Sequence, residues 1–148
     1  MLHVRDARAE DLIAVRTLLL QLPIEPETEL GDDARAEAAF AATIAQPGHS
    51  LLVIEDQSEI IGTLVLLIVP NLTHDAAPWA ILENFVVAED RRGQRVGREL
   101  LAAAVTRARA AGCYKVQLLS NNVRQDAHRF YGAFGFEPSA QGFRLYLH

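Results

Sequence analysis

The part of the sequence best suited to bind phosphate is a run of arginines and glycines over residues 91–98. It reads Arg91-Arg92-Gly93-Gln94-Arg95-Val96-Gly97-Arg98, with four arginines and no acid, in a chain of 148 residues whose net charge is −5. An apolar segment precedes the run, and apolar residues at helical spacing follow it. A strand, turn and helix in this order direct free backbone N–H groups and the positive end of the helix at one point. We therefore expect a polyphosphate to bind there.

The common nucleotide motifs do not explain this turn. No Gly-Lys-Ser/Thr follows it, which excludes a P-loop, and Gly-x-Gly-x-x-Gly is absent. A solvated arginine loop that only caps a helix is the alternative interpretation, because a short glycine motif is weak evidence by itself.

Hydrophobic periodicity indicates the elements that must position the turn. Glycine follows the last two expected helices at Gly112 and Gly135, and Pro23 and Pro26 stop the first one. The pattern predicts one domain over 1–148, of the α/β (α+β) class, with a mixed sheet and helices on both faces. Strands are expected over 2–5, 51–55, 59–69, 79–87, 114–119 and 142–147, with one more near 136, and helices over 12–22, 32–45, 96–112 and 127–134.

Composition narrows the function classes. Half of the residues are hydrophobic, which argues for a folded core, and the acidic balance argues against a general binder of nucleic acid or anionic membranes. The single cysteine, Cys113, excludes an internal disulfide and fits a reducing compartment. The longest apolar run, Ile60 to Val69, is too short to span a bilayer, and no leader opens the chain. We expect a cytoplasmic protein, and the five histidines show no spacing typical of metal ligands.

A second block, Asp126-Ala127-His128-Arg129-Phe130-Tyr131 followed by Gly135-Phe136, stands downstream of the turn. With Arg92-Gly93-Gln94-Arg95-Val96-Gly97 it resembles the GNAT superfamily of acyl-CoA-dependent N-acyltransferases. The turn of that family reads Arg/Gln-x-x-Gly-x-Gly/Ala, and its later block reads Ala-x-x-Phe-Tyr-x-x-x-Gly-Phe. The resemblance covers most of the chain and implies a mostly antiparallel, twisted sheet.

The sequence departs from the family pattern at Arg95, which stands where the family has its first glycine. We expect an ordinary helix start there, with the side chain pointing away. A positive φ at this residue would instead cost about 1 kcal/mol.

The resemblance implies acetyl-CoA as the acyl donor. Its pyrophosphate would lie on the amides of the turn, and its pantetheine arm would pair like an added strand with the end of the preceding strand. The thioester would lie where strand 79–87 diverges from strand 114–119. The residues implied to bind the cofactor are Phe85, Val86, Val87, Arg92, Gly93, Gln94, Arg95, Val96, Gly97, Arg98, Asn122 and Phe130.

Acetyl transfer to an amine needs a base for the ammonium proton and benefits from an acid for the departing thiolate. Strand alternation puts Glu83 on one face with Ile81, Phe85 and Val87, so we expect a carboxylate buried among apolar neighbours that acts as base, directly or through water. A structural ion pair is the alternative role. Asn84 is expected on the other face. The resemblance implies that Tyr131 is the acid, and the alternative is that Tyr131 is an aromatic residue that only packs in the core. A strand N–H of Val86 or Val87 would stabilise the oxyanion.

The amine acceptor is less defined. Residues 122–131 look most like aminoalkylphosphonate N-acetyltransferases, and residues 81–87 are similar to glucosamine-phosphate N-acetyltransferases, so a phosphorus-bearing primary amine is favoured. A protein or peptide acetyltransferase would need an open groove beside loop 70–78, from which His74 and Asp75 could enter the site. A catalytically silent acyl-CoA-binding module is the alternative from another class. Homodimerisation is implied by the resemblance alone.

Overall fold

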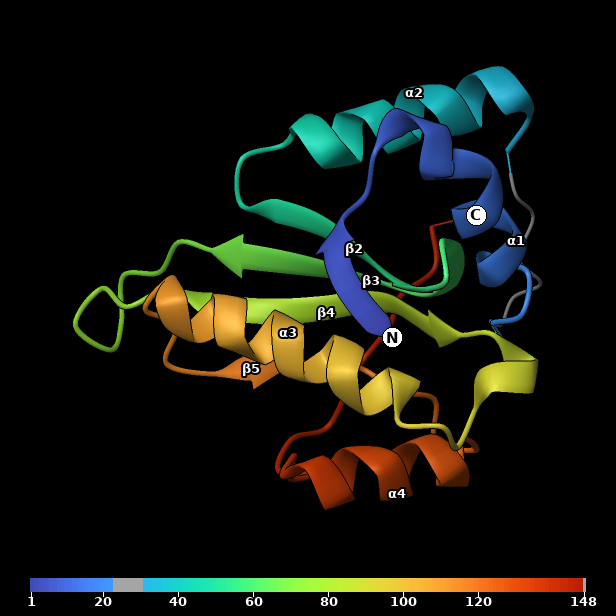
Figure 1. Ribbon diagram of the computed structural model, residues 1–148. Coiled ribbons are helices and arrows are strands. Elements are labelled where there is room, and N and C mark those ends of the chain that lie inside the picture. Colours follow the sequence, from blue (N-terminus) through green and yellow to red (C-terminus); the bar gives the residue numbers. More distant parts are fainter. Residues whose placement is uncertain (23–30, 148) are drawn as a thin grey trace. The chain divides into compact units, whose positions relative to one another are not determined.

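The computed structural model describes residues 1–22 and 31–147 (Figure 1). It consists of two compact units, Met1–Gln117 and Leu118–His148, and each is described here by itself. Within the described residues, no helix is long and apolar enough to cross a membrane.

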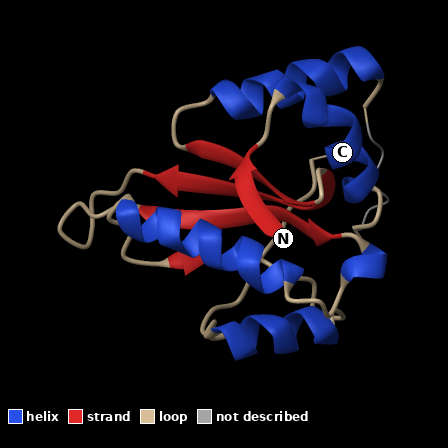
Figure 2. Cartoon of the chain, in the orientation of Figure 1, coloured by secondary structure: helices blue, strands red, loops and turns tan. Residues whose placement is uncertain are grey.

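The first unit is built on one five-stranded sheet in the order β1-β2-β3-β4-β5 (Figure 2). The first four strands pair antiparallel, and β5 pairs parallel with β4. The mixed, mostly antiparallel sheet predicted from the sequence is therefore confirmed. The strands are β1 (Leu2–Asp6), β2 (His49–Asp56), β3 (Glu59–Val69), β4 (Trp79–Val87) and β5 (Val116–Gln117).

Helices cover both faces of this sheet. Val15 of α1 (Leu12–Leu19) and Phe40 of α2 (Asp33–Ala45) pack in one buried cluster with Leu51, Val53 and Val65. The opposite face lies under α3 (Val96–Ala110), whose Leu100 and Leu101 are fully buried. Because alternate residues of a strand point to opposite faces, β2 and β3 are buried on both sides, which explains their nearly continuous apolar runs. Two short 3-10 turns, η1 (Ala9–Asp11) and η2 (Glu89–Arg91), precede α1 and α3.

A buried ion pair joins β1 to η1. The Arg5 guanidinium donates to both oxygens of Asp11, at 2.7 and 3.1 Å, and to Glu55 at 3.1 Å. Asp11 is only 5% exposed and also accepts from the backbone N–H of Arg8 at 2.7 Å. The hydrogen bond from Arg5 holds the pKa of the Asp11 carboxyl below its ordinary value, against the opposing effect of burial.

The second unit contains α4 (Gln125–Phe134), which ends at Gly135 with a φ of +121°. A glycine tolerates this conformation without strain. The Tyr131 ring lies edge-on to Phe130 and Phe136, with ring centroids 5.5 and 5.8 Å apart.

Four expectations about the elements are wrong. The first helix ends at Leu19, so Leu22 lies beyond it; the expected stop at Pro23 and Pro26 falls outside the described residues. Strand β5 is limited to Val116–Gln117, where it has a ladder partner. No strand forms over 142–147 or at residue 136 among the described residues, because an alternating apolar pattern makes a strand only where a neighbour accepts its hydrogen bonds.

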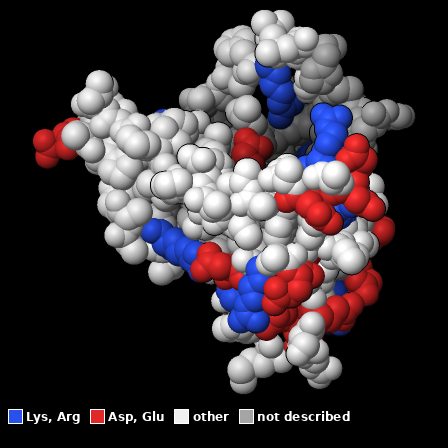
Figure 3. Space-filling model, turned by 90° about the horizontal axis from the view of Figure 1, so that it is seen from above, with Lys and Arg blue, Asp and Glu red and all other residues white. Residues whose placement is uncertain are grey.

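Charge on the surface is mixed in sign. On the face seen in Figure 3, acidic and basic side chains are interleaved and most of the surface belongs to other residues.

Candidate active site

The backbone of the arginine-rich turn is left-handed at two positions. Gly93 has a φ of +76°, and Arg95, which caps the N-terminus of α3, has a φ of +67° and a ψ of −3°. The expectation of an ordinary helix start at Arg95 is therefore wrong. The physical reason is that the chain must reverse sharply between η2 and α3. A family glycine makes that reversal at low cost, whereas an arginine does so under strain.

Side chains of the turn fold back onto the chain that leads into it. Arg92 Nε donates to the carbonyl of Val87 at 3.2 Å, and Gln94 Nε2 donates to the carbonyl of Asp90 at 3.1 Å. Arg95 makes an exposed ion pair with Glu99 at 3.4 Å. The first turn of a helix leaves its N–H groups without intrahelical acceptors, and an anion can accept hydrogen bonds from such groups.

A β-bulge interrupts β4 at the centre of the site. Glu83 pairs with Val65 and Val86 pairs with Thr63, so two residues of β4 stand opposite the single residue Leu64. One of the two is Asn84, with a φ of +51°, in the left-handed region that asparagine tolerates better than most residues.

The bulge overturns the expectations for Glu83 and Asn84. Directly paired residues share a face, so Glu83 lies on the face of Val65. Asn84 lines a pocket together with Val65, so both residues are on the side of α1 and α2. Ile81 shares the face of Glu83 as expected, because Ile81 pairs with Leu67 and Glu83 with Val65 in regular register, but the alternation does not continue through the bulge to Val87. The expected burial of Glu83 is also wrong, because this residue is exposed.

The ladder between β4 and β5 ends before the last residues of β4. Pairing with β5 is confined to Ala80 and Ile81. On the other side, Val86 and Val87 pair with β3, and the N–H of Ala88 donates to the carbonyl of Ile61 at 2.8 Å. The segment predicted to pair with the pantetheine arm therefore lies beyond the residues of β4 that pair with β5.

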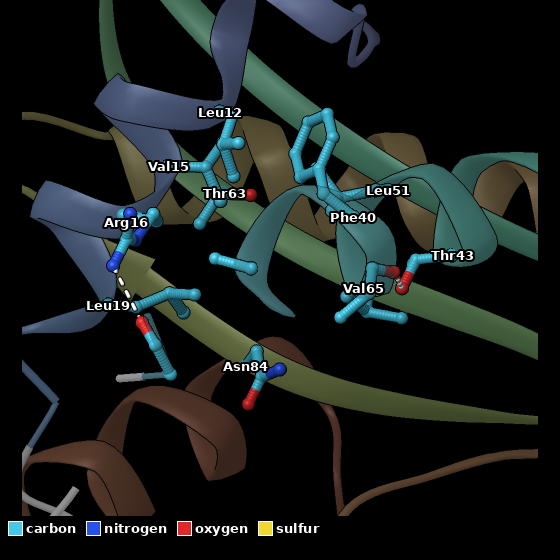
Figure 4. A pocket seen from close by; sticks show the side chains of 13 residues that line it. Leu12, Val15, Arg16, Leu19, Phe40, Thr43, Leu51, Thr63, Val65 and Asn84 are labelled. Atoms are coloured by element: carbon cyan, nitrogen blue, oxygen red, sulfur yellow. Dashed lines mark hydrogen bonds between the residues drawn. The ribbon is translucent and has the colours of Figure 1, made fainter. Parts of the chain in front are cut away.

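A pocket of about 260 Å³ lies between the sheet and the two helices α1 and α2 (Figure 4). Its floor includes Thr63 and Val65 of β3, and Asn84 lines it from the bulge. The remaining lining residues are Leu12, Val15, Arg16, Leu19, Gly31, Ala36, Ala39, Phe40, Thr43 and Leu51. Sequence reasoning missed Arg16. The available signal was its spacing, because Arg16 stands four residues after Leu12 and three before Leu19, on the apolar stripe of α1.

Tyr131 lies in the second unit, where it is half-buried on α4. Burial raises the pKa of its phenol, while the charge of Arg124 lowers the pKa to a smaller extent. The group therefore keeps its proton at neutral pH, as a general acid must. Asn122 is exposed, and its carbonyl accepts from Gln125 Nε2 at 2.9 Å.

The loop before β4 does not bring its histidine to the pocket. His74 stacks on Tyr114, with ring centroids 3.9 Å apart and planes 10° from parallel. Asn71 Nδ2 closes the loop by donating to the carbonyls of Thr73 and Ala77, at 2.8 and 3.2 Å. The described part of the chain also holds no group of three or more His, Cys, Asp or Glu side chains placed to bind a metal.

Comparison with known proteins identifies the family. Residues 12–136 match the model of the acetyltransferase (GNAT) family. The aminoalkylphosphonate N-acetyltransferase of Salmonella typhimurium is 34% identical over 138 residues, which cover 93% of this chain and 86% of that protein. The glucosamine 6-phosphate N-acetyltransferase of Trypanosoma brucei brucei is 32% identical over 88 residues, covering 60% of this chain and 58% of that protein.

The fold comparison agrees with the sequence comparison. The crystal structure of a transcriptional regulator from Bacillus halodurans superposes with a TM-score of 0.92 at 27% identity, covering 99% of this chain and 100% of that one. The resemblance inferred from the two sequence blocks is thus confirmed, and with it the family's donor, acetyl-CoA. The chain belongs to the acetyltransferase (GNAT) family and is an N-acetyltransferase.

Proposed function

We propose that this protein transfers the acetyl group of acetyl-CoA to the primary amine of a small molecule by direct attack. The observation that carries the proposal is the left-handed backbone at Gly93 and Arg95, in the turn that leads into α3, because the N-terminus of a helix offers backbone amides to an anion. The end of β4, beyond its ladder with β5, lies immediately before this turn in the chain. One segment can thus hold the diphosphate and the pantetheine arm of the same cofactor.

The donor-binding residues in this proposal are those of the turn and the strand end. The amides of Gly93 to Arg98 bind the pyrophosphate, and Phe85 to Val87 pair with the pantetheine arm. Arg92 supports this arrangement by tying the turn to the carbonyl of Val87. Asn122 and Phe130 of the second unit are proposed as further contacts with the cofactor.

The chemistry requires proton transfers at both the nitrogen and the sulfur. Glu83 accepts one proton from the ammonium, and its exposure favours transfer through an intervening water. The neutral amine then attacks the thioester carbonyl, the C–N bond forms, and a strand N–H of Val86 or Val87 stabilises the oxyanion. As the C–S bond breaks, Tyr131 gives its proton to the departing thiolate. The nitrogen of the intermediate loses its second proton to water, and Tyr131 is protonated again from solvent.

The acceptor is proposed to be a small amine with a phosphonate or phosphate group. Two relatives carry that substrate class in their names, aminoalkylphosphonate and glucosamine 6-phosphate N-acetyltransferase. The pocket supports a small acceptor, because about 260 Å³ is below the roughly 300–1,000 Å³ of sites for drug-sized ligands.

Release of the CoA thiol across a panel of amines tests the proposal. The panel contains phosphorus-bearing amines, neutral small amines and short peptides. Turnover on small amines is expected. Turnover confined to peptides would instead indicate that the protein is a peptide acetyltransferase. Binding of acetyl-CoA without amine-dependent release of the CoA thiol would indicate a catalytically silent acyl-CoA-binding module. The homodimer implied by the resemblance stays a prediction.

A further inference from the structure

We infer that Arg16 binds the anionic phosphonate or phosphate group of the acceptor and so determines which amines are acetylated. This inference rests on the proposed function, since it places the acceptor in the pocket beneath α1 and α2. Arg16 is the charged residue among the described residues that line this pocket. Leu12, Val15 and Leu19 line it from the same helix.

The position of Arg16 suits a binding role. Figure 4 shows its side chain among the lining residues, with the guanidinium hydrogen-bonded at one end of the pocket. Nη2 donates to the carbonyl of Gly31 at 2.9 Å, and Nη1 pairs with Asp33 at 2.8 Å. The Arg16 side chain is 27% exposed, so it can be reached from solvent while its stem packs against apolar neighbours.

The pairing with Asp33 leaves Arg16 able to bind another anion. Asp33 is 91% exposed, and an ion pair with such an exposed carboxylate contributes little, because water competes for both partners. A guanidinium carries five N–H donors in a planar fork, and phosphonate or phosphate oxygens match that fork in two-point contacts. A dianion offers more oxygens and more charge than the carboxylate that it would displace.

The polar residues of the pocket give the acceptor a direction. Asn84 lines the pocket from the β4 bulge, next in sequence to Glu83 and to the segment proposed to pair with the pantetheine arm. An amine anchored by its anion at Arg16 on α1 can therefore extend its nitrogen toward β4. Neutral amines lack the anchor, so the pocket should discriminate against them mainly through binding.

Matched pairs of acceptors test this assignment. An aminoalkylphosphonate is compared with the alkylamine of equal chain length, and glucosamine 6-phosphate is compared with glucosamine. Arg16→Gln should lower kcat/KM for the anionic member of the preferred pair by about tenfold or more, mainly through KM. Its kcat/KM for the neutral member should change by less than about threefold. In the wild type, the pair with the larger ratio of kcat/KM for the anionic amine to kcat/KM for its neutral partner shows whether the preferred anion is a phosphonate or a phosphate.

Two further variants exclude a merely structural effect. Asp33→Asn removes the competing carboxylate, so KM for the anionic amine should fall or stay the same. Arg35→Gln removes an equal charge from an exposed position on α2 that does not line the pocket. This variant should leave the ratio of kcat/KM for anionic and neutral amines unchanged. An equal loss for anionic and neutral amines in Arg16→Gln would mean that Arg16 only tethers α2, and would overturn the inference.

Direct binding separates this inference from the proposed function. Calorimetric titration of the anionic amine into the protein saturated with CoA needs no turnover. If the wild type binds the anionic amine and Arg16→Gln binds it at least tenfold more weakly, the assignment holds even when no acetyl transfer is seen. Equal binding by the two proteins, or no binding by the wild type, refutes it.

Discussion

Backbone strain at Arg95 predicts which of two substitutions at this position gives the more stable protein. Arg95 is the N-cap of α3 and has a φ of +67°. We predict that Arg95→Gly is more stable than Arg95→Ala. At an ordinary helical position the order is reversed, because glycine there costs about 0.8–1 kcal/mol relative to alanine.

The size of the effect follows from two opposing contributions. The left-handed conformation costs an L-residue about 1–2 kcal/mol, and glycine avoids that cost. The greater freedom of glycine in the unfolded chain offsets about 0.4–1 kcal/mol of the gain. The exposed ion pair with Glu99 is lost in both variants and cancels from the difference. The free energy of unfolding of Arg95→Gly should therefore exceed that of Arg95→Ala by about 0.8 kcal/mol at the midpoints of the two contributions, a difference in Tm of roughly 2–3 °C for a chain of this size.

Urea unfolding of both variants measures the difference, in the absence of acetyl-CoA so that ligand binding does not contribute. The matched control is Arg98, an exposed residue in the first turn of α3. There, Arg98→Gly should be less stable than Arg98→Ala. If glycine is the less stable substitution at both positions, the left-handed conformation of Arg95 is refuted.

Three further predictions concern catalysis and stability. Tyr131→Phe should slow turnover by about 10²-fold or less, since thiolates leave fairly well unaided, and an undiminished rate in this variant would remove the acid role. Because the pKa of the Tyr131 phenol is raised, the kcat of the wild type should not fall through loss of this acid as the pH rises to the ordinary pKa of tyrosine. Glu83→Gln should lower kcat/KM for the amine by about 10²-fold near neutral pH. The kcat/KM of this variant should rise again at higher pH, because more of the amine is then neutral and needs no base. A loss that does not depend on pH would point to a structural carboxylate. Asp11→Asn should lower the free energy of unfolding by about 1.5–3 kcal/mol at neutral pH, because Arg5 loses a buried charged partner. The pKa of Asp11 is depressed in the folded state, so its contribution is present above the unfolded pKa and is lost as pH falls below about 4. Urea unfolding against pH measures this, and Asp6→Asn, which breaks the exposed pair with Arg107, is the control that should cost no more than about 1 kcal/mol.

Much of the fold could be predicted because each element carries its own local signal. The apolar run of β4 was predicted with its observed bounds, and Asp32 caps α2 by accepting from the N–H of Arg35 at 2.9 Å. The expected strand over 142–147 failed because alternation reports a surface suited to pairing, while pairing itself depends on a distant neighbour.

The candidate site was predicted less completely, and two residues show why. The bulge at Asn84 depends on the register between β3 and β4, which period-two alternation cannot reveal. It put Asn84 on the same side of the sheet as Glu83 and ended the alternation that was expected to continue to Val87. Arg16 takes part in a pocket only once α1 and α2 pack on the sheet, so its place on the apolar stripe of α1 could not show that this stripe lines a pocket.

The most direct test of acetyl transfer to a small amine is release of the CoA thiol with and without an aminoalkylphosphonate, with mass spectrometry of the product. We predict release that depends on the amine concentration, with one N-acetylated product formed for each thiol released. A rate of thiol release that does not depend on the amine concentration would contradict the account. Tight binding of acetyl-CoA with no acetylated product from any small amine would also contradict it.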